Sequence, residues 1–356
     1  MRIYNFAAGP AMLPHEVLTK IQEEIFNWQG TGISVMEIGH RTKIFQDFLE
    51  NLQQKIKELM NIPSNYKVLF LQGGAQGQFA GIPMNLVKNN QNVDYLVTGI
   101  WSKRAAEHAA KYAKVNIVTE RAGLSIPDAS TWKLNPDACY AYYCPNETID
   151  GVQFSEIPNV GKVPLVADMT SNILSYEIDV SKFGLIFAAA QKNLGISGVT
   201  LVIIRDDLID QHLNITPNIW NYKLLSECNS SVNTVPVFAL YVMGLMVDWI
   251  KEQGGVKVLA EINQRKVNKL YDYIDSISFY NNNIDKNYRS MVNIPFDLMK
   301  KDLLQKFLDE ATDNGLHYLK GHMIVGGARA SLYNAMPESG VDKLIEFMDV
   351  FAQENK

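Results

Sequence analysis

Short, nearly continuous runs of apolar and β-branched residues recur through the central part of the chain. Such runs are typical of strands that are buried on both faces, as in a mainly parallel sheet covered by helices. The pattern predicts strands at residues 68–71, 95–98, 115–119, 139–143, 165–167, 185–188 and 200–204.

Stretches with helical periodicity lie between some of these strands. Residues 15–28 repeat apolar side chains at the spacing of one helix face, and residues 42–60 and 102–113 show a similar pattern. Strands that alternate with helices predict an α/β domain whose ligand site lies at the carboxyl ends of the strands.

The pattern changes after about residue 255, where a long helix is predicted at 256–274. Shorter elements follow: strands near 291–294, 316–319 and 329–333, a helix near 301–314 and a last helix from Val341. We therefore predict a large domain at 15–255 and a smaller α+β domain formed by residues 1–14 and 256–356.

Composition narrows the class of protein. With 356 residues, 47% of them hydrophobic, the chain is long enough for two domains. Its formal net charge of -5 gives no electrostatic reason to expect nucleic acid or an anionic membrane as a partner. The three cysteines, Cys139, Cys144 and Cys228, lack metal-like spacing, so we expect neither a disulfide framework nor a metal site.

The longest apolar stretch, residues 235–247, contains Pro236 and is followed by Asp248. A membrane span needs about 20 apolar residues, so this stretch predicts a buried helix instead. The N-terminus also lacks the basic start and apolar core of a signal peptide. We expect a soluble, cytoplasmic protein.

An acid and a lysine follow two consecutive predicted strands. Asp168 ends one apolar run and Lys192 follows the next, so both would lie at the same edge of the sheet. Burial lowers the pKa of an amine and makes it a competent nucleophile for a carbonyl. A pyridoxal cofactor needs this pair, a lysine for its aldehyde and an acid that keeps its pyridine nitrogen protonated. A solvated lysine or a plain ion pair would explain the same residues.

Three other strand ends carry residues that suit such a cofactor. The glycine-rich stretch 72–79 precedes a helical run, and a helix N-terminus there would favour a phosphate. Trp101 could stack on the ring, and the hydroxyl of Thr148 could reach the same crevice. An ordinary glycine turn, a core tryptophan and a simple turn are the respective alternatives.

Positive charge for an acidic substrate could come from His40, Arg41 and Arg329. Arginine pairs bidentately with carboxylates and phosphates, which makes the two arginines candidates for substrate binding. The alternative is that both arginines are simply solvated.

Seven motifs occur in order along the chain, at residues 5–14 (NFAAGPAMLP), 34–37 (SVME) with His40 and Arg41, 144–151 (CPNETIDG), 190–193 (AQKN), 233–234 (NT), 320–322 (KGH) and 329–337 (RASLYNAMP). Together they resemble the phosphoserine aminotransferase family, class V pyridoxal-phosphate enzymes of fold type I. The resemblance implies an α/β large domain with a mainly parallel seven-stranded sheet and a smaller α+β C-terminal domain. It also implies a homodimer with active sites at the interface.

The resemblance implies a role for each matching residue. Lys192 would hold pyridoxal 5'-phosphate as a Schiff base and carry the proton, and Asp168 would pair with the pyridine nitrogen. Arg329 would bind the substrate carboxylate. The remaining implied cofactor contacts are Trp101, Thr148, Ala75, Gln76 and Gln191, with Asn233 and Thr234 of the neighbouring subunit. The residues implied around the distal acidic group of the substrate are Arg41, His40 and His322.

The implied reaction is reversible amino transfer between glutamate and 3-phosphohydroxypyruvate, which gives 2-oxoglutarate and phosphoserine in serine biosynthesis. A phosphorylated hydroxythreonine of pyridoxine biosynthesis is a second implied substrate. The sequence departs from the family at Met323, where members typically have an arginine, and at Gln76 and Ala8, where some members have arginine and serine.

Three alternatives remain beside this interpretation of the sequence. An aminotransferase for an unphosphorylated amino acid shares the lysine chemistry and needs no phosphate-binding arginine. A cysteine desulfurase-like lyase would need a nucleophilic thiol from Cys144 or Cys228. A binding or structural protein would contain no cofactor.

Overall fold

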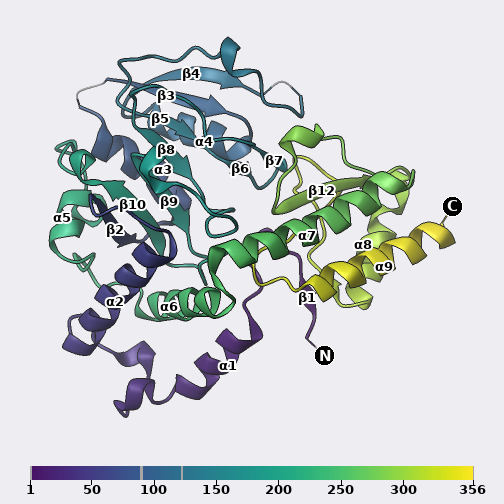
Figure 1. Ribbon diagram of the computed structural model, residues 1–356, viewed down its shortest axis with the longest axis horizontal. Helices are drawn as coiled ribbons and strands as arrows, with labels where there is room; N and C mark the ends of the chain where they lie inside the picture. Colours follow the sequence, from purple (N-terminus) through teal and green to yellow (C-terminus); the bar gives the residue numbers. More distant parts are fainter. Residues whose placement is uncertain (1, 89–90, 122, 356) are drawn as a thin grey trace.

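The computed structural model describes residues 2–88, 91–121 and 123–355, and its centre is a seven-stranded sheet (Figure 1). The strand order is β2-β10-β9-β8-β5-β3-β4. Strand β10 is antiparallel to both of its neighbours, and every other adjacent pair is parallel, so the sheet is mainly parallel as predicted. The bounds are Tyr66–Leu71 (β2), Asn92–Val97 (β3), Lys114–Glu120 (β4), Ala141–Tyr143 (β5), Leu165–Asp168 (β8), Leu185–Ala189 (β9) and Thr200–Arg205 (β10).

In β2 and in the inner strands of the sheet, neighbouring residues face two different hydrophobic cores. In β2, Val68 and Phe70 belong to one core, and Leu69 and Leu71 belong to the other. Because helices cover both faces, β9 is buried at every position, which explains its continuous apolar sequence. The first core includes residues of α1 (His15–Glu24), α2 (Lys43–Leu59) and α6 (Val237–Glu252), and the second includes residues of α3 (Gly74–Leu86), α4 (Ile100–Ala109) and α5 (Tyr222–Glu227).

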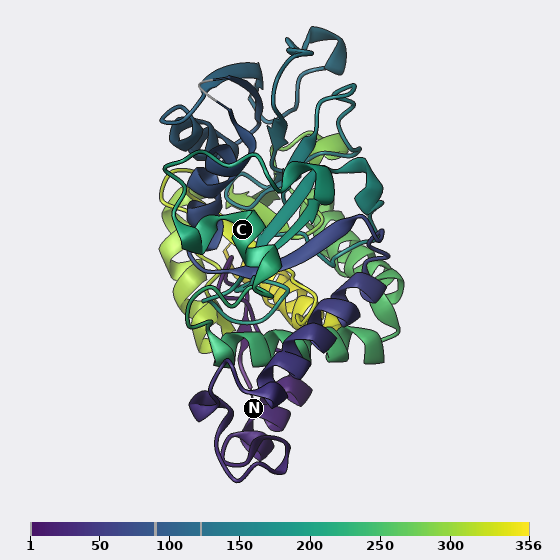
Figure 2. The same ribbon diagram turned by 90° about the vertical axis from the view of Figure 1, so that its left-hand side faces the viewer.

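The C-terminal part of the chain forms a second unit beside the large sheet (Figure 1). Its core is a separate hydrophobic cluster that also contains Phe6 from the N-terminus. The N-terminal strand β1 pairs in parallel with β13, so the first and last described segments both lie in this unit (Figure 1), whereas the segment from α1 to α2 projects at the bottom of the molecule (Figure 2). The elements are β1 (Tyr4–Asn5), α7 (Gly255–Ser276), β11 (Tyr280–Asn281), β12 (Asn293–Leu298), α8 (Leu304–Asp313), β13 (Leu316–His317), β14 (Ala328–Ser331) and α9 (Glu338–Glu354).

Several predicted elements end earlier than the sequence indicates. The helix predicted at 15–28 ends at Glu24, and Gln29 beyond it has a φ of 51°, which a continuing helix does not allow. The strand predicted at 316–319 ends at His317 because Tyr318 has a φ of 64°. The hairpin of β6 (Asn146–Glu147) and β7 (Val152–Gln153) is not predicted, since its sequence is largely polar.

The helix α6 corresponds to the apolar stretch predicted as a buried helix, and most of its side chains are buried. Within residues 2–88, 91–121 and 123–355, none of the helices has the length and apolar character needed to cross a membrane.

Candidate active site

The carboxyl ends of β2, β3, β5, β8 and β9 lie at one edge of the sheet, because these strands run in the same direction. The predicted residues follow these ends: Ala75 and Gln76 after β2, Trp101 after β3, Thr148 after β5, Asp168 as the last residue of β8, and Gln191 and Lys192 after β9. The structure therefore brings together side chains from the carboxyl ends of five strands, at the edge where the strand pattern predicts a ligand site.

Lys192 is buried at this edge, with 8% of its surface exposed. Its Nζ donates a hydrogen bond to Oγ1 of Thr148 at 2.7 Å. Burial lowers the pKa of Lys192 to about 8, although the negative charge of Asp168 opposes this shift. A substantial part of the amine is therefore neutral near pH 8, as nucleophilic attack on a carbonyl requires.

Asp168 is also buried, on the strand next to that of Lys192. Its carboxylate accepts hydrogen bonds from the Thr170 N–H at 3.0 Å and from the Tyr142 hydroxyl at 3.4 Å. Burial raises the pKa of Asp168, whereas the Thr170 hydrogen bonds and the Lys192 charge lower it. An acid in this position can pair with a protonated ring nitrogen.

Several polar groups at the same edge have no partner within the described part of the chain. They include Nε1 of Trp101 and Nε of Arg329, both of which are buried. At the start of α3, Gly73 and Gly74 have φ angles of 104° and 62°, and the first N–H groups of this helix have no partner within it. An indole, a reactive amine, a buried acid and a helix N-terminus are the groups needed to hold an aromatic aldehyde that carries a phosphate.

Arg329 lies on β14, and its side chain points toward the loop that contains Thr148. Its Nη1 donates to the carbonyl oxygen of Thr148 at 3.3 Å, and burial lowers the pKa of the guanidinium. A guanidinium in this position has donors left for a carboxylate of a small ligand.

The other predicted residues are not joined to this cluster. In the described chain, His40, Arg41, His322, Asn233 and Thr234 form no hydrogen bond or ion pair with Lys192 or Asp168. Arg41 is exposed just before α2, and His322 accepts a hydrogen bond from the Ile324 N–H at 3.3 Å. Asn233 donates to Oε1 of Gln72 at 3.0 Å, and Gln72 donates to the carbonyl oxygen of Thr234 at 3.2 Å, beside the glycine turn that precedes α3.

Two residues at the site have no role in the sequence-based hypothesis. Gly9 has a φ of 143° and packs on the stem of Lys192, where an added Cβ would lie 3.6 Å from Cε. Glu147 is fully buried and accepts hydrogen bonds from the N–H groups of Trp101 and Ser102. In the sequence, Glu147 is marked by its place in the motif 144–151, next to Thr148, but its burial is not, because an acid in a polar turn is usually exposed.

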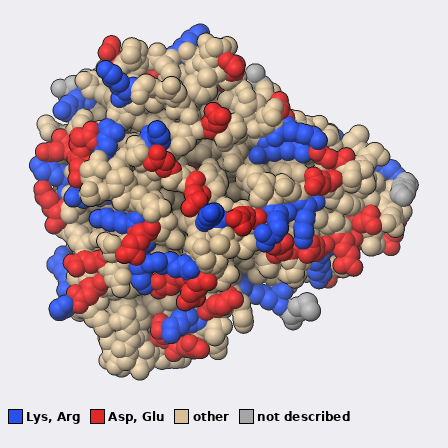
Figure 3. Space-filling model, viewed as in Figure 1, with Lys and Arg blue, Asp and Glu red and all other residues tan. Residues whose placement is uncertain are grey.

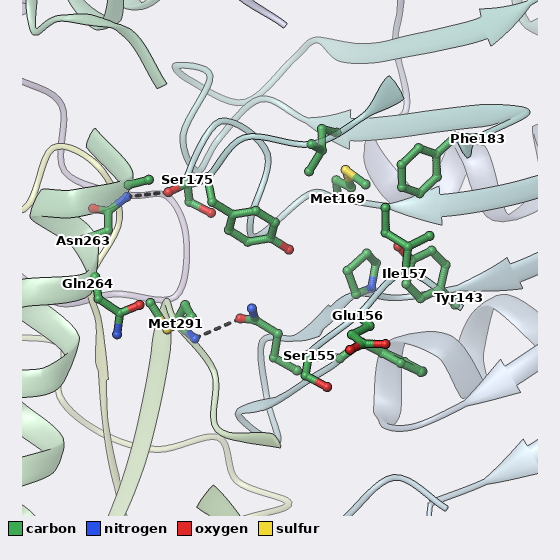
Figure 4. A pocket seen from close by; sticks show the side chains of 16 residues that line it. Tyr143, Ser155, Glu156, Ile157, Met169, Ser175, Phe183, Asn263, Gln264 and Met291 are labelled. Atoms are coloured by element: carbon green, nitrogen blue, oxygen red, sulfur yellow. Dashed lines mark hydrogen bonds between the residues drawn. The ribbon is translucent and has the colours of Figure 1, made fainter. Parts of the chain in front are cut away.

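A cavity of about 260 Å³ lies between the large sheet and α7 (Figure 4). Met169, Tyr143 and Phe183 line one side, and Asn263 and Gln264 of α7 lie on the opposite side. None of the predicted site residues lines this cavity. The reactive groups are those at the carboxyl edge of the sheet.

The aminotransferase class-V family model matches residues 3–344 of the chain. The chain is 50% identical to a phosphoserine aminotransferase from Hahella chejuensis over 357 residues, which cover 99% of each protein. It is 49% identical to a phosphoserine aminotransferase from Acinetobacter baylyi over the full length of both proteins.

Solved structures show the same similarity in three dimensions. The phosphoserine aminotransferase from Bacillus circulans subsp. alkalophilus superposes with a TM-score of 0.97 at 40% identity, covering 100% of this chain and 99% of that one. The phosphoserine aminotransferase from Trichomonas vaginalis with bound PLP has a TM-score of 0.94 at 39% identity, covering 98% of this chain and 100% of that one.

Proposed function

The chain belongs to the class V aminotransferase family, and on this basis we propose that it is a pyridoxal-phosphate enzyme that interconverts phosphoserine and 3-phosphohydroxypyruvate with 2-oxoglutarate and glutamate. This reaction is a step of serine biosynthesis. The observation that carries the proposal is the pairing of a buried lysine with a buried acid at the carboxyl edge of the sheet, in a chain about half identical to phosphoserine aminotransferases over its full length.

Pyridoxal 5'-phosphate supplies, when bound, an electron-accepting ring that makes the Cα–H bond of an amino acid acidic. In our proposal Lys192 would bind the aldehyde of the cofactor, and Asp168 would pair with its ring nitrogen. Trp101 and Thr148 would contact the ring. The residues proposed to hold the phosphate are Ala75, Gln76 and Gln191, with Asn233 and Thr234 of the partner subunit.

Lys192 is proposed to take a proton from the substrate Cα and to deliver it to the C4′ position of the cofactor, and to do the reverse in the second half of the reaction. A pKa of about 8 suits this exchange, because an amine near its pKa both accepts and donates a proton readily at neutral pH. Thr148 orients the nitrogen through its hydroxyl group. Asp168 would remain ionised opposite a protonated ring nitrogen, since the two charges stabilise each other.

Arg329 is proposed to bind the α-carboxylate, and Arg41, His40 and His322 to surround the distal phosphate. Arg41 has no ion-pair partner among the described residues, so its charge is available for a ligand. Met323, next to His322, is 91% exposed and adds no charge to this group. The phosphate would therefore depend on Arg41 and the two histidines.

A homodimer with active sites at the interface is part of this proposal. Phe26 is 85% exposed, and Ile33 and Met36 of the same segment are exposed as well. This segment joins α1 to α2 and forms the uncharged lower end of the molecule in Figure 3. Large apolar side chains gathered on one projection are typical of a protein interface, and His40 and Arg41 lie directly after it.

We also propose the domain division 15–255 for cofactor binding and 1–14 with 256–356 for the small domain. The pairing of β1 with β13 and the place of Phe6 in the C-terminal core support it. A cytoplasmic location, as predicted from the sequence, belongs to the same proposal.

The neutral Met323 favours one other candidate, an aminotransferase for an unphosphorylated amino acid. Steady-state rates with phosphoserine, serine and alanine, each with 2-oxoglutarate, separate the two. We expect kcat/KM for phosphoserine to be at least 100-fold higher, since a phosphate held by charged groups contributes about 3 kcal/mol or more. A preference for serine or alanine would disprove the proposed substrate.

The burial of Cys144 argues against this thiol as the nucleophile of the desulfurase alternative, which leaves the exposed Cys228 as its candidate. Burial raises the pKa of Cys144 well above its ordinary value, so the thiol stays protonated and is a poor nucleophile. Its Sγ lies 3.4 Å from the carbonyl oxygen of Asn146, within the protein interior.

A further inference from the structure

The carboxylate of Glu147 lies at the first turn of α4, the helix that carries Trp101, and 0% of the residue is exposed. Oε2 accepts a hydrogen bond from the Trp101 N–H at 3.0 Å, and Oε1 accepts from the N–H and the hydroxyl of Ser102 at 2.9 and 2.6 Å. The first N–H groups of a helix have no partner inside it, so this carboxylate satisfies them and meets the positive end of the helix dipole.

Asp150 binds the N–H group that precedes the two bound by Glu147. Its Oδ2 accepts from the Ile100 N–H at 3.1 Å, and its Oδ1 pairs with Arg121 at 2.8 Å. Two acids of one loop therefore hold three consecutive N–H groups of α4. Arg121 balances the charge of Asp150, whereas Glu147 has no ion-pair partner in the described chain and depends on α4 for its stabilisation.

Thr148 lies between these two acids and faces the lysine. Its hydroxyl accepts from Lys192, and its carbonyl oxygen accepts from Arg329. The loop thus connects the backbone of Trp101 to Lys192 through two adjacent residues. The approach is so close that a Cβ at Gly99 would overlap the Glu147 carboxyl group, so a larger residue at Gly99 would push the loop and the helix apart.

We propose that Glu147 is a positioning residue that fixes the backbone of Trp101 relative to Thr148 and Lys192, and so sets the gap in which the cofactor ring is held. This inference rests on the proposed cofactor contacts of Trp101 and Lys192. Within the described residues, the carboxylate accepts hydrogen bonds from Trp101 and Ser102 of α4, and it acts through the position of Trp101 rather than through proton transfer. Its role is to fix the distance between α4, which carries Trp101, and the loop that carries Thr148. These two segments follow different strands.

The charge of Glu147 gives this role a measurable signature. The charges that act on Glu147 or respond to it are Asp150, which is paired with Arg121, and Lys192. Burial raises the pKa of Glu147 to about 7, and the hydrogen bonds from Ser102 and Trp101 oppose this shift. The negative charge of Glu147 favours the protonated form of the Lys192 nitrogen, so its removal lowers the pKa of that nitrogen.

Glu147→Gln tests the inference, because it keeps the shape of the side chain but replaces one acceptor oxygen with an NH2 group. We expect the Kd of the purified variant for pyridoxal 5'-phosphate, measured by visible absorbance, to rise about tenfold. The pH midpoint of the bound cofactor's absorbance should also shift to a lower pH than in the unmodified protein. Glu156→Gln, which changes an exposed acid of the same segment, should leave both values unchanged.

Ser102→Ala provides a second variant if Glu147→Gln does not fold. It removes one donor to Glu147 and should weaken cofactor binding in the same direction by a smaller factor. If both the Kd and the pH midpoint of Glu147→Gln equal those of the unmodified protein, the inference is wrong, even if the Tm falls. If the unmodified protein itself binds no pyridoxal 5'-phosphate, the proposed function fails instead.

Discussion

Nζ of Lys192 and Oγ1 of Thr148 are joined by a hydrogen bond of 2.7 Å that connects the segment after β9 with the segment after β5. The carbonyl oxygen of the same threonine accepts from Arg329. One residue therefore contacts both the proposed cofactor lysine and the proposed carboxylate-binding arginine. The lysine is held in a defined place even though its side chain is long and unbranched.

Thr148→Val should lower kcat about fivefold. The substitution keeps the shape but removes a hydrogen bond worth about 1 kcal/mol, which orients the amine. Steady-state rates with phosphoserine measure the change, and Thr131→Val at an exposed site is the matched control. An unchanged kcat would show that the hydroxyl does not orient Lys192 during turnover.

Met323→Arg should lower the KM for phosphoserine by roughly 10- to 100-fold without raising kcat. A new hydrogen-bonded arginine beside His322 would contribute about 1.5–3 kcal/mol to phosphate binding. Met299→Arg adds the same charge at another exposed site and should change neither constant. If the KM stays the same, the phosphate is bound away from the loop that carries Met323.

Lys266 should make stability depend on pH. It is fully buried, donates to the carbonyl oxygens of Tyr333 and Met336, and burial lowers its pKa to about 7. Between pH 7 and about 10.5 the unfolded chain binds a proton that the folded chain does not, so stability rises with pH in this window.

Lys266→Met removes this titration. The stability of the unmodified protein relative to the variant should therefore increase from pH 7 to pH 9, by at most about 1.4 kcal/mol per pH unit. Urea unfolding at several pH values measures it. A difference that does not vary with pH would mean that Lys266 keeps its proton in the folded protein.

Phe26→Asp should convert the proposed dimer into monomers. The substitution places a charge within the apolar segment between α1 and α2, where burial in an interface would be costly. Sedimentation velocity measures the mass, and Met299→Asp, an exposed apolar position in the C-terminal unit, is the control. A dimer that persists with the same affinity would place the interface elsewhere.

The sequence predicts the strands of the large sheet, because short runs such as 185–188 are apolar at every position, as in strands that are buried on both faces. It also predicts that Asp168 and Lys192 share an edge, because each follows such a run. The family resemblance adds the roles of residues such as Trp101 and Arg329, which periodicity alone leaves open.

Other features of the site arise from tertiary contacts that no local pattern records. Glu147 is in a polar turn, yet its carboxylate is buried against Trp101 and Ser102, which belong to a helix far away in the sequence. The positive φ of Tyr318 ends a strand that its apolar neighbours would allow to continue. The neutral state of Cys144 likewise depends on the residues packed around it rather than on those next to it in sequence.

The most direct test of the account is to find the residue that holds the cofactor. Borohydride reduction of the purified, cofactor-loaded protein, followed by peptide mass spectrometry, should place a phosphopyridoxyl group on Lys192, and Lys192→Ala should carry no label and no transaminase activity. A label on a different lysine, or full activity in Lys192→Ala, would contradict the account.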